Sequence, residues 1–263
     1  MRRSIRSLLI LLFSIVLLYS GYRISVTYWG YARSEAARDA LIDLAVSSYD
    51  GTGESCVSLP DSHVMNAKTD SAMAAAPCVD FDALRRVNPD IVAWLYCQGT
   101  SINYPIVRGG DNTYYLDHLI TGEFNNSGTL FMDWRCTPDF SDINTVVYGH
   151  HMKNGGMFAS IVKYRSQEYY DMHSEMYLLT PVKEYRLEIF SGHITSPDSQ
   201  SYSIRFEQDT DFETFLGDAV EKSDFISDIK PTLHDRIITF STCTYEYDDA
   251  RYVVHAILKS IDD

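Results

Sequence analysis

Short runs of β-type residues, separated by turn residues, occupy most of the chain beyond residue 80. The runs are rich in Val, Ile, Tyr, Phe and Thr, and Gly, Pro, Asn, Asp or Ser bounds them, which is the pattern of strands joined by turns. Strands at this regular spacing predict a mainly β fold, in the form of a closed β-barrel of about eight strands. The predicted strands are Ile91–Tyr96, Ser101–Val107, Gly128–Trp134, Ile143–Tyr148, Met176–Thr180, Glu184–Thr195, Arg236–Cys243 and Arg251–Ile261.

Helical periodicity interrupts the β pattern and predicts a few peripheral helices. The predicted helices are Asp80–Val87, Met157–Tyr164 and Thr210–Phe225. In the longest of them, Asp209 or Thr210 is expected to cap the first turn.

The N-terminus carries an export signal. Three arginines within residues 1–6 precede an apolar run, Leu8–Tyr19, that only Ser14 interrupts. The run is shorter than a typical membrane span of about 20 residues, so a cleaved signal peptide is an alternative interpretation. An uncleaved anchor is favoured because apolar residues continue to Val26, aromatic residues follow at the expected interface, and no A-x-A site follows the apolar run. The positive N-terminus then lies in the cytoplasm, which predicts a single-pass cell-membrane protein with an extracellular domain.

These signals divide the chain into parts. Residues 1–27 are predicted to form the cytoplasmic tip and transmembrane anchor, residues 28–78 an amphipathic helix and linker, and residues 79–263 the exported domain. Within residues 29–46, apolar residues recur at helical spacing in one main stripe and in an adjacent stripe. The main stripe is Trp29, Ala32, Ala36, Ala40 and Leu44, and the adjacent stripe is Ala37 and Leu41.

Composition excludes several kinds of partner. The formal net charge of −14 argues against nucleic acid, because phosphate binding depends on clustered Lys and Arg. The five cysteines are too few for a disulfide scaffold, and no CxxC pair indicates zinc, so we expect no metal or cofactor. A disulfide between Cys56 and Cys78 is possible, but spacing alone does not determine connectivity.

Cys243 lies at the end of a predicted strand. Alternation along Arg236–Cys243 places Ile237, Thr239, Ser241 and Cys243 on one face. A polar loop follows, and Arg251 begins the next strand. If the two strands pair as a hairpin, Arg251 lies beside Cys243.

His150 also follows a strand end. The predicted strand Ile143–Tyr148 runs into Gly149, His150 and His151, and Gly149 permits a turn that a residue with a Cβ atom would resist. A thiolate is a nucleophile, imidazole can protonate a leaving amine, and a guanidinium can stabilise an oxyanion. Cys243, His150 and Arg251 at one edge of a barrel would therefore suit acyl transfer.

At these residues the chain resembles the sortase family. The segment Ile237–Cys243, the turn Tyr148–His151 and the downstream Arg251 resemble the TLxTC, GHH and Arg signature of sortases. The resemblance extends over roughly residues 80–261 and is closest to class B, through Asn88–Leu95, Ile102–Val107, Asp111–His118 and Gly128–Asp133. Phe240 is a departure, because the family often has Leu there.

The resemblance implies a sortase-like barrel and a cysteine transpeptidase. Cys243 would attack the threonine carbonyl of a sorting motif near the C-terminus of a secreted protein and form a thioacyl enzyme. His150 would protonate the leaving amine and Arg251 would hold the oxyanion. An amine of a cell-wall precursor or of another protein would then resolve the intermediate. Neither the exact motif, NPQTN-like or PxTG-like, nor the amine follows from the sequence.

Other interpretations stay open for single residues. His150 and His151 could be a metal pair, although adjacent strand residues point to opposite faces. Arg251 could form an exposed ion pair with Asp248 or Asp249. Ser241 is a candidate for substrate contact, but packing or a hydrogen bond would explain it nearly as well. The remaining residues expected to be structural or at the surface are Cys97, Cys136, His118, His173, His193, His234 and His255, and His151 is expected to shape its turn.

Two other functions are considered. One is a different extracellular Cys-His peptidase or an L,D-transpeptidase, but an L,D-transpeptidase would show Ser-x-Gly-Cys-x-Arg, and a papain-like enzyme would carry Cys before His. The other is a non-catalytic surface-binding module, which would form no thioacyl adduct on Cys243.

Overall fold

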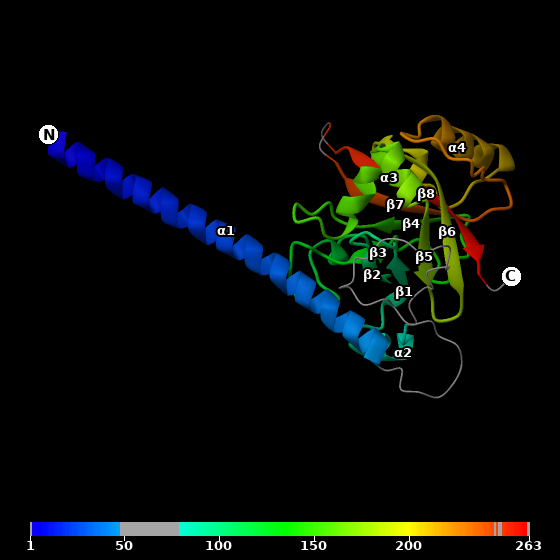
Figure 1. The fold of residues 1–263 in the computed structure, drawn as a ribbon, viewed down its shortest axis with the longest axis horizontal. Helices are drawn as coiled ribbons and strands as arrows, with labels where there is room; N and C mark the ends of the chain where they lie inside the picture. Colours follow the sequence, from blue (N-terminus) through cyan, green and yellow to red (C-terminus); the bar gives the residue numbers. More distant parts are fainter. Residues whose placement is uncertain (1, 48–78, 245, 247–248, 262–263) are drawn as a thin grey trace, which may run out of the picture.

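The predicted barrel is confirmed. A computed structural model describes residues 2–47, 79–244, 246 and 249–261, and its strands form a closed barrel in the order β1-β2-β3-β4-β7-β8-β6-β5 (Figure 1). Each predicted strand is present, several with trimmed ends. The strands are β1 (Ile91–Tyr96), β2 (Asn103–Val107), β3 (Leu130–Met132), β4 (Asn144–Tyr148), β5 (Glu175–Leu179), β6 (Glu184–Thr195), β7 (Ile237–Cys243) and β8 (Arg251–Ser260).

The pairing of three strands positions the candidate site. β4 runs parallel to β7, with Tyr148 opposite Ser241. β7 and β8 form the predicted antiparallel hairpin, in which Cys243 is the register partner of Arg251. Parallel neighbours end at the same edge of a sheet, so the segment after β4 lies beside the end of β7 and the start of β8.

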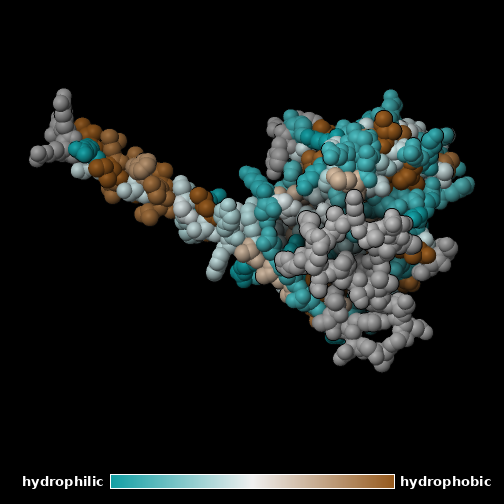
Figure 2. Space-filling model, in the orientation of Figure 1, coloured by the Kyte–Doolittle hydropathy of each residue, from teal (hydrophilic) through white to brown (hydrophobic). Residues whose placement is uncertain are grey.

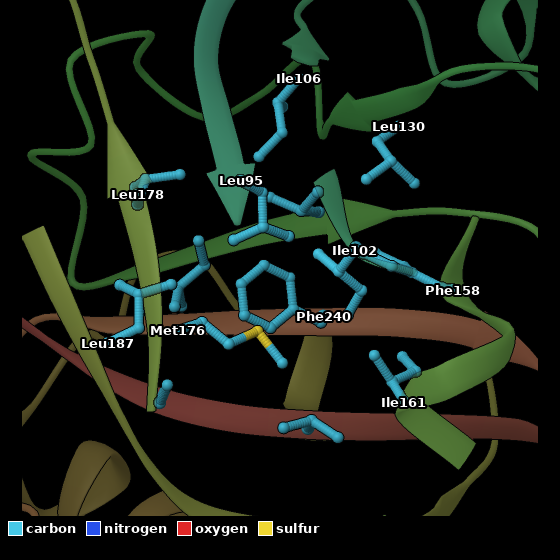
Figure 3. Close-up of a cluster of buried hydrophobic side chains, with 14 of the residues drawn as sticks. Leu95, Ile102, Ile106, Leu130, Phe158, Ile161, Met176, Leu178, Leu187 and Phe240 are labelled. Atoms are coloured by element: carbon cyan, nitrogen blue, oxygen red, sulfur yellow. The ribbon is translucent and has the colours of Figure 1, made fainter. Parts of the chain in front are cut away.

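The barrel interior is an apolar core. Phe240 lies near the centre of this core with its side chain fully buried (Figure 3). Ile238 belongs to the same core, whereas Ile237 packs in a separate cluster with α4 (Asp209–Glu221) on the outside of the wall. Because side chains alternate along a strand, Cys243 shares the outward phase of Ile237. The predicted division of β7 into two faces is therefore confirmed.

The predicted helices are present in modified form. α2 (Phe81–Val87) is capped by Asp80, whose carboxylate accepts a hydrogen bond from the Ala83 backbone N–H at 2.8 Å. Residues Phe158–Arg165 form a 3₁₀ helix, η2, where helical periodicity alone did not distinguish the type. Short helices that periodicity did not predict are η1 (Tyr114–Leu116), α3 (Gln167–Met172) and η3 (Gln200–Tyr202).

The expected cap of α4 is wrong. Gln208 occupies the cap position and makes no side-chain capping bond, whereas Asp209 is already helical. Asp209 and Asp211 instead lie in the first turn, where negative charge interacts favourably with the helix dipole.

α1 (Arg2–Ser47) is one continuous helix, so the predicted boundary at residue 27 falls inside it. Its N-terminal part projects from the barrel and presents exposed apolar residues (Figures 1 and 2). By length and composition, the stretch from Ile5 to Ala45 contains a segment that can cross a membrane. The predicted linker and the Cys56–Cys78 disulfide lie outside the described residues.

The C-terminal part of α1 packs on the barrel. Leu41 and Ala45 are buried there, and the Asn125 side-chain amide donates a 2.9 Å hydrogen bond to the Gly30 carbonyl. Arg33 pairs with Glu123 at 2.8 Å. The packed face therefore includes Leu41 of the adjacent stripe, whereas most of the predicted main stripe, including Trp29, Ala32, Ala36 and Ala40, is exposed. Apolar spacing located the helix but not the face that contacts the barrel.

Candidate active site

The three predicted site residues line one groove. The groove lies outside the barrel wall, where the ends of β4 and β7 meet the start of β8, and its volume is about 500 Å³. Residues of the segment between β6 and α4 also line it. The lining residues are Asn112, Leu116, Phe131, Arg135, Tyr148, Gly149, His150, Pro197, Asp198, Ser199, Tyr202, Ser203, Ser241, Thr242, Cys243 and Arg251.

Cys243 is the accessible thiol among the three cysteines that the structure describes. It is partly exposed in the groove, whereas Cys97 and Cys136 are buried. Burial raises the pKa of Cys97 to about 11 and that of Cys136 to about 12, so both stay protonated at neutral pH. The thiolate is the reactive form of cysteine, and these two thiols are therefore unsuited to nucleophilic chemistry.

Backbone hydrogen bonds fix the His150 turn against β7. The Gly149 N–H donates to the Ser241 carbonyl at 3.1 Å, and the Thr242 hydroxyl donates to the Gly149 carbonyl at 2.7 Å. The imidazole Nε2 of His150 lies 2.6 Å from the Leu116 carbonyl oxygen. A carbonyl only accepts, so Nε2 carries the proton in this contact, and neutral His150 presents its unprotonated nitrogen at Nδ1.

Position 149 requires a glycine because of close packing, not because of a special backbone conformation. Its backbone is not among the positive-φ glycines of the described chain. A Cβ atom there would instead lie 2.7 Å from Cδ2 of Phe158 and would also overlap the Leu130 side chain. Close packing, rather than backbone conformation, thus explains the glycine before His150.

His151 lies beside the backbone of Cys243. Its Nδ1 is 3.2 Å from the carbonyl oxygen of Cys243, and its backbone forms an isolated bridge with Met157. Throughout the described part of the chain, no group of three His, Cys, Asp or Glu residues could hold a metal ion. His151 therefore connects the turn to the end of β7.

Arg251 is held by the backbone just before it. Nη1 donates to the carbonyls of Asp249 and Ala250 at 3.0 and 3.2 Å, and Nη2 lies 4.0 Å from the Asp249 carboxylate. That carboxylate is 82% exposed, so the pair contributes little to stability. A guanidinium has five N–H donors, which leaves capacity for a ligand in the groove.

Ser241 already has a hydrogen-bonding partner. Its side chain is 2% exposed, and its Oγ lies 2.8 Å from the Tyr202 hydroxyl. Tyr202 in turn stacks on Tyr148 at a centroid distance of 6.1 Å, and the Tyr148 hydroxyl donates to Asp133 at 3.0 Å. The sequence analysis did not predict the contacts of Tyr202 with Ser241 and Tyr148, because Tyr202 lies in no motif.

The other histidines that the structure describes lie outside the groove. His193 and His255 are buried against each other with ring centroids 5.4 Å apart. His118 and His173 contact backbone carbonyls through Nδ1, and His234 is exposed.

Comparison with known proteins identifies the family. The profile of the sortase domain matches residues 95–259. Sortase B of Listeria monocytogenes is 38% identical over 177 residues, which cover 66% of this chain and 72% of the relative. Sortase B of Staphylococcus aureus is 34% identical, over 69% of this chain and 74% of the relative.

Solved structures agree with the sequence relatives. A Staphylococcus aureus sortase B–substrate complex superposes with a TM-score of 0.66 at 34% identity, over 69% of this chain and 85% of that one. A Bacillus anthracis protein similar to sortase B gives 0.64 at 40% identity, over 68% and 82%. The chain therefore belongs to class B of the sortase family of cysteine transpeptidases. The other peptidase classes and the non-catalytic module considered above are set aside.

Proposed function

We propose that the chain cleaves a C-terminal sorting motif after threonine and transfers the acyl group to an amine of a cell-wall precursor. The convergence of Cys243, His150 and Arg251 on one groove carries this proposal. A groove of about 500 Å³ can hold several residues of an extended peptide. The relatives add support, because sortase B structures are described with a substrate and with triglycine, a peptide that begins with a primary amine.

The three candidate catalytic residues have distinct roles in the proposed reaction. The Cys243 thiolate attacks the threonine carbonyl, forms the thioester and expels the amine as the tetrahedral intermediate collapses. His150 gives a proton to that amine. The incoming amine then attacks the thioester carbonyl and loses a proton to His150; the new amide bond forms as the C–S bond breaks and the Cys243 thiolate is released. Arg251 donates hydrogen bonds to the oxygen on which negative charge develops. No cofactor takes part in these steps.

We infer that α1 is the membrane anchor of this enzyme. Its exposed apolar N-terminal part would span the membrane, and its continuous C-terminal part would hold the catalytic domain on the extracellular side. The proposed division is an anchor in residues 1–27, a juxtamembrane helix and linker in residues 28–78, and a catalytic domain in residues 79–263. N-terminal sequencing of the membrane fraction tests this: the anchor retains residues 1–27, whereas a cleaved signal loses them.

A panel of internally quenched peptides tests the catalytic proposal. The panel contains NPQTN-like and PxTG-like motifs, each with and without triglycine as the amine. We expect cleavage and transfer by the full chain, and a thioacyl adduct on Cys243 detectable by mass spectrometry. Cys243→Ala should abolish both, whereas Cys97→Ala, which changes a buried thiol outside the groove, should retain the adduct. A wild-type rate from Cys243→Ala would refute the assignment.

A further inference from the structure

A second arginine contacts the residues that follow Cys243 and Arg251. Arg165, the last residue of η2, donates from Nη2 to the Thr244 hydroxyl at 3.3 Å and forms an ion pair with Glu246. Its guanidinium carbon lies 5.3 Å from the centre of the Tyr252 ring. We call Arg165, Thr244, Glu246 and Tyr252 the Arg165 cluster. Thr244 comes directly after Cys243, and Tyr252 directly after Arg251.

The Arg165 cluster lies on the opposite face of the hairpin from the groove. Cys243 and Arg251 are register partners that line the groove. Tyr252 belongs to the barrel core, as alternation along β8 requires when Arg251 points outward. Arg165 does not line the groove. Any effect of Arg165 on the reaction is therefore transmitted through the hairpin, which makes it a positioning residue.

Several contacts within the cluster reinforce one another. The Thr244 hydroxyl also bonds to the Glu246 carboxylate, and the Thr244 N–H donates to the Ala250 carbonyl at 3.0 Å, which closes the connection between β7 and β8. Hydrogen bonding to Arg165 lowers the pKa of Glu246 to about 2, so this carboxylate is ionised at every working pH. The paired side chains are only 35% and 33% exposed. An arginine bound to a carboxylate and a hydroxyl, and placed over an aromatic ring, holds a more defined geometry than a simple surface pair.

We propose that Arg165, acting through Thr244 and Glu246, sets the distance between the Cys243 thiol and the Arg251 guanidinium. This inference rests on the proposed function, in which one group attacks the carbonyl and the other stabilises the oxyanion. Both interactions are made in the transition state, so a loosened hairpin lowers kcat more than it raises KM. A misplacement near 1 Å can cost up to about a hundredfold in rate, and we expect a loss of at least about tenfold.

The test uses the full chain in detergent and four variants. Arg165→Met and Glu246→Gln each remove the ion pair and should lower kcat about tenfold, with KM changed less than about threefold. Arg165→Lys keeps the charge but not the planar fork, and should fall between wild type and Arg165→Met. The exchanged pair, Arg165→Glu with Glu246→Arg, restores opposite charges and should recover part of the lost kcat.

A matched control separates this effect from the loss of any ion pair. Arg186 and Glu188 pair at 2.7 Å on β6, with 44% and 21% exposed side chains, and neither lines the groove. Arg186→Met should leave kcat unchanged. A second readout needs no peptide: the rate at which iodoacetamide alkylates Cys243 is measured as a function of pH. This pH profile should shift in Arg165→Met, because a loosened hairpin rearranges the charges near the thiol.

The outcomes distinguish the two proposals. If the wild type cleaves the peptides, wild-type kcat and an unchanged alkylation profile in Arg165→Met overturn the positioning role. If the loss of kcat among the variants parallels their loss of thermal stability, and the exchanged pair recovers no kcat, the positioning role is also overturned in favour of a purely structural role. If the wild type cleaves no peptide, the proposed function fails, while the alkylation profile still decides whether Arg165 controls the environment of Cys243.

Discussion

Replacing Gly149 by alanine tests how the His150 turn is packed. The new Cβ atom would lie 2.7 Å from Cδ2 of Phe158 and would overlap the Leu130 side chain. Both neighbours are fully buried, so neither can move into solvent. Gly149 itself is tied to β7 through the hydrogen bonds to Ser241 and Thr242. We therefore expect Gly149→Ala both to compress the core and to displace the turn from β7.

The expected cost follows from these contacts. Overpacking of a rigid core typically costs about 2 kcal/mol, and the loss of one of the two hydrogen bonds adds about 1 kcal/mol. The free energy of unfolding should therefore fall by about 3 kcal/mol, which corresponds to a decrease in Tm of roughly 6 to 12 °C for a domain of this size. Because His150 is the next residue, kcat should fall about tenfold or more.

Urea unfolding of the full chain in detergent, monitored by tryptophan fluorescence, measures this loss of stability. Peptide cleavage is measured in parallel. Gly110→Ala is the matched control, because a Cβ atom there meets nothing within 4 Å; its unfolding free energy should stay within about 0.5 kcal/mol of wild type. Leu130→Val removes the atom nearest the new methyl group, so the double variant should be more stable than the sum of the single effects predicts. Wild-type stability and kcat in Gly149→Ala would refute the packing argument.

Two further predictions concern groups whose pKa values are shifted by burial. At pH 8, iodoacetamide should modify Cys243 in the folded chain and spare Cys97 and Cys136, whose pKa values are about 11 and 12; peptide mapping that finds the buried thiols modified at the same rate would contradict this. Burial lowers the pKa of His193 to about 4 and also lowers that of His255, so both are neutral in the folded state. The unfolded chain binds more protons below pH 6.5, so stability should decrease as pH falls from about 6.5 to 4, by on the order of 3 kcal/mol for His193 alone. Urea midpoints across this range should lose part of their pH dependence in His193→Gln, and an unchanged slope would show that another group is responsible.

Much of the fold was predictable because strand signals are local. Apolar alternation and turn residues located β1 to β8. The alternation of β7 divided it into two faces, and the structure shows that Ile238 and Phe240 belong to the core face. The juxtaposition of Cys243 and Arg251 was predictable too, because two strands joined by a short loop pair as a hairpin.

Contacts between distant segments were not predictable in this way. The face of α1 that packs on the barrel depends on which residues of the barrel meet it, and the apolar pattern alone did not indicate which stripe would pack. Gly149 was correctly singled out, but the contact with Phe158 that requires it was not predictable, since Phe158 fills the space beside it only after η2 has packed.

The sequence by itself determined the strands, the hairpin and the identity of the candidate catalytic residues, because each follows from alternation, turn chemistry or a local motif. Only the tertiary structure decided that Tyr202 engages Ser241 and that Arg165 contacts the residues after Cys243 and Arg251. These side chains come from segments far apart in the chain, and no local pattern encodes a contact that exists only once the barrel has closed.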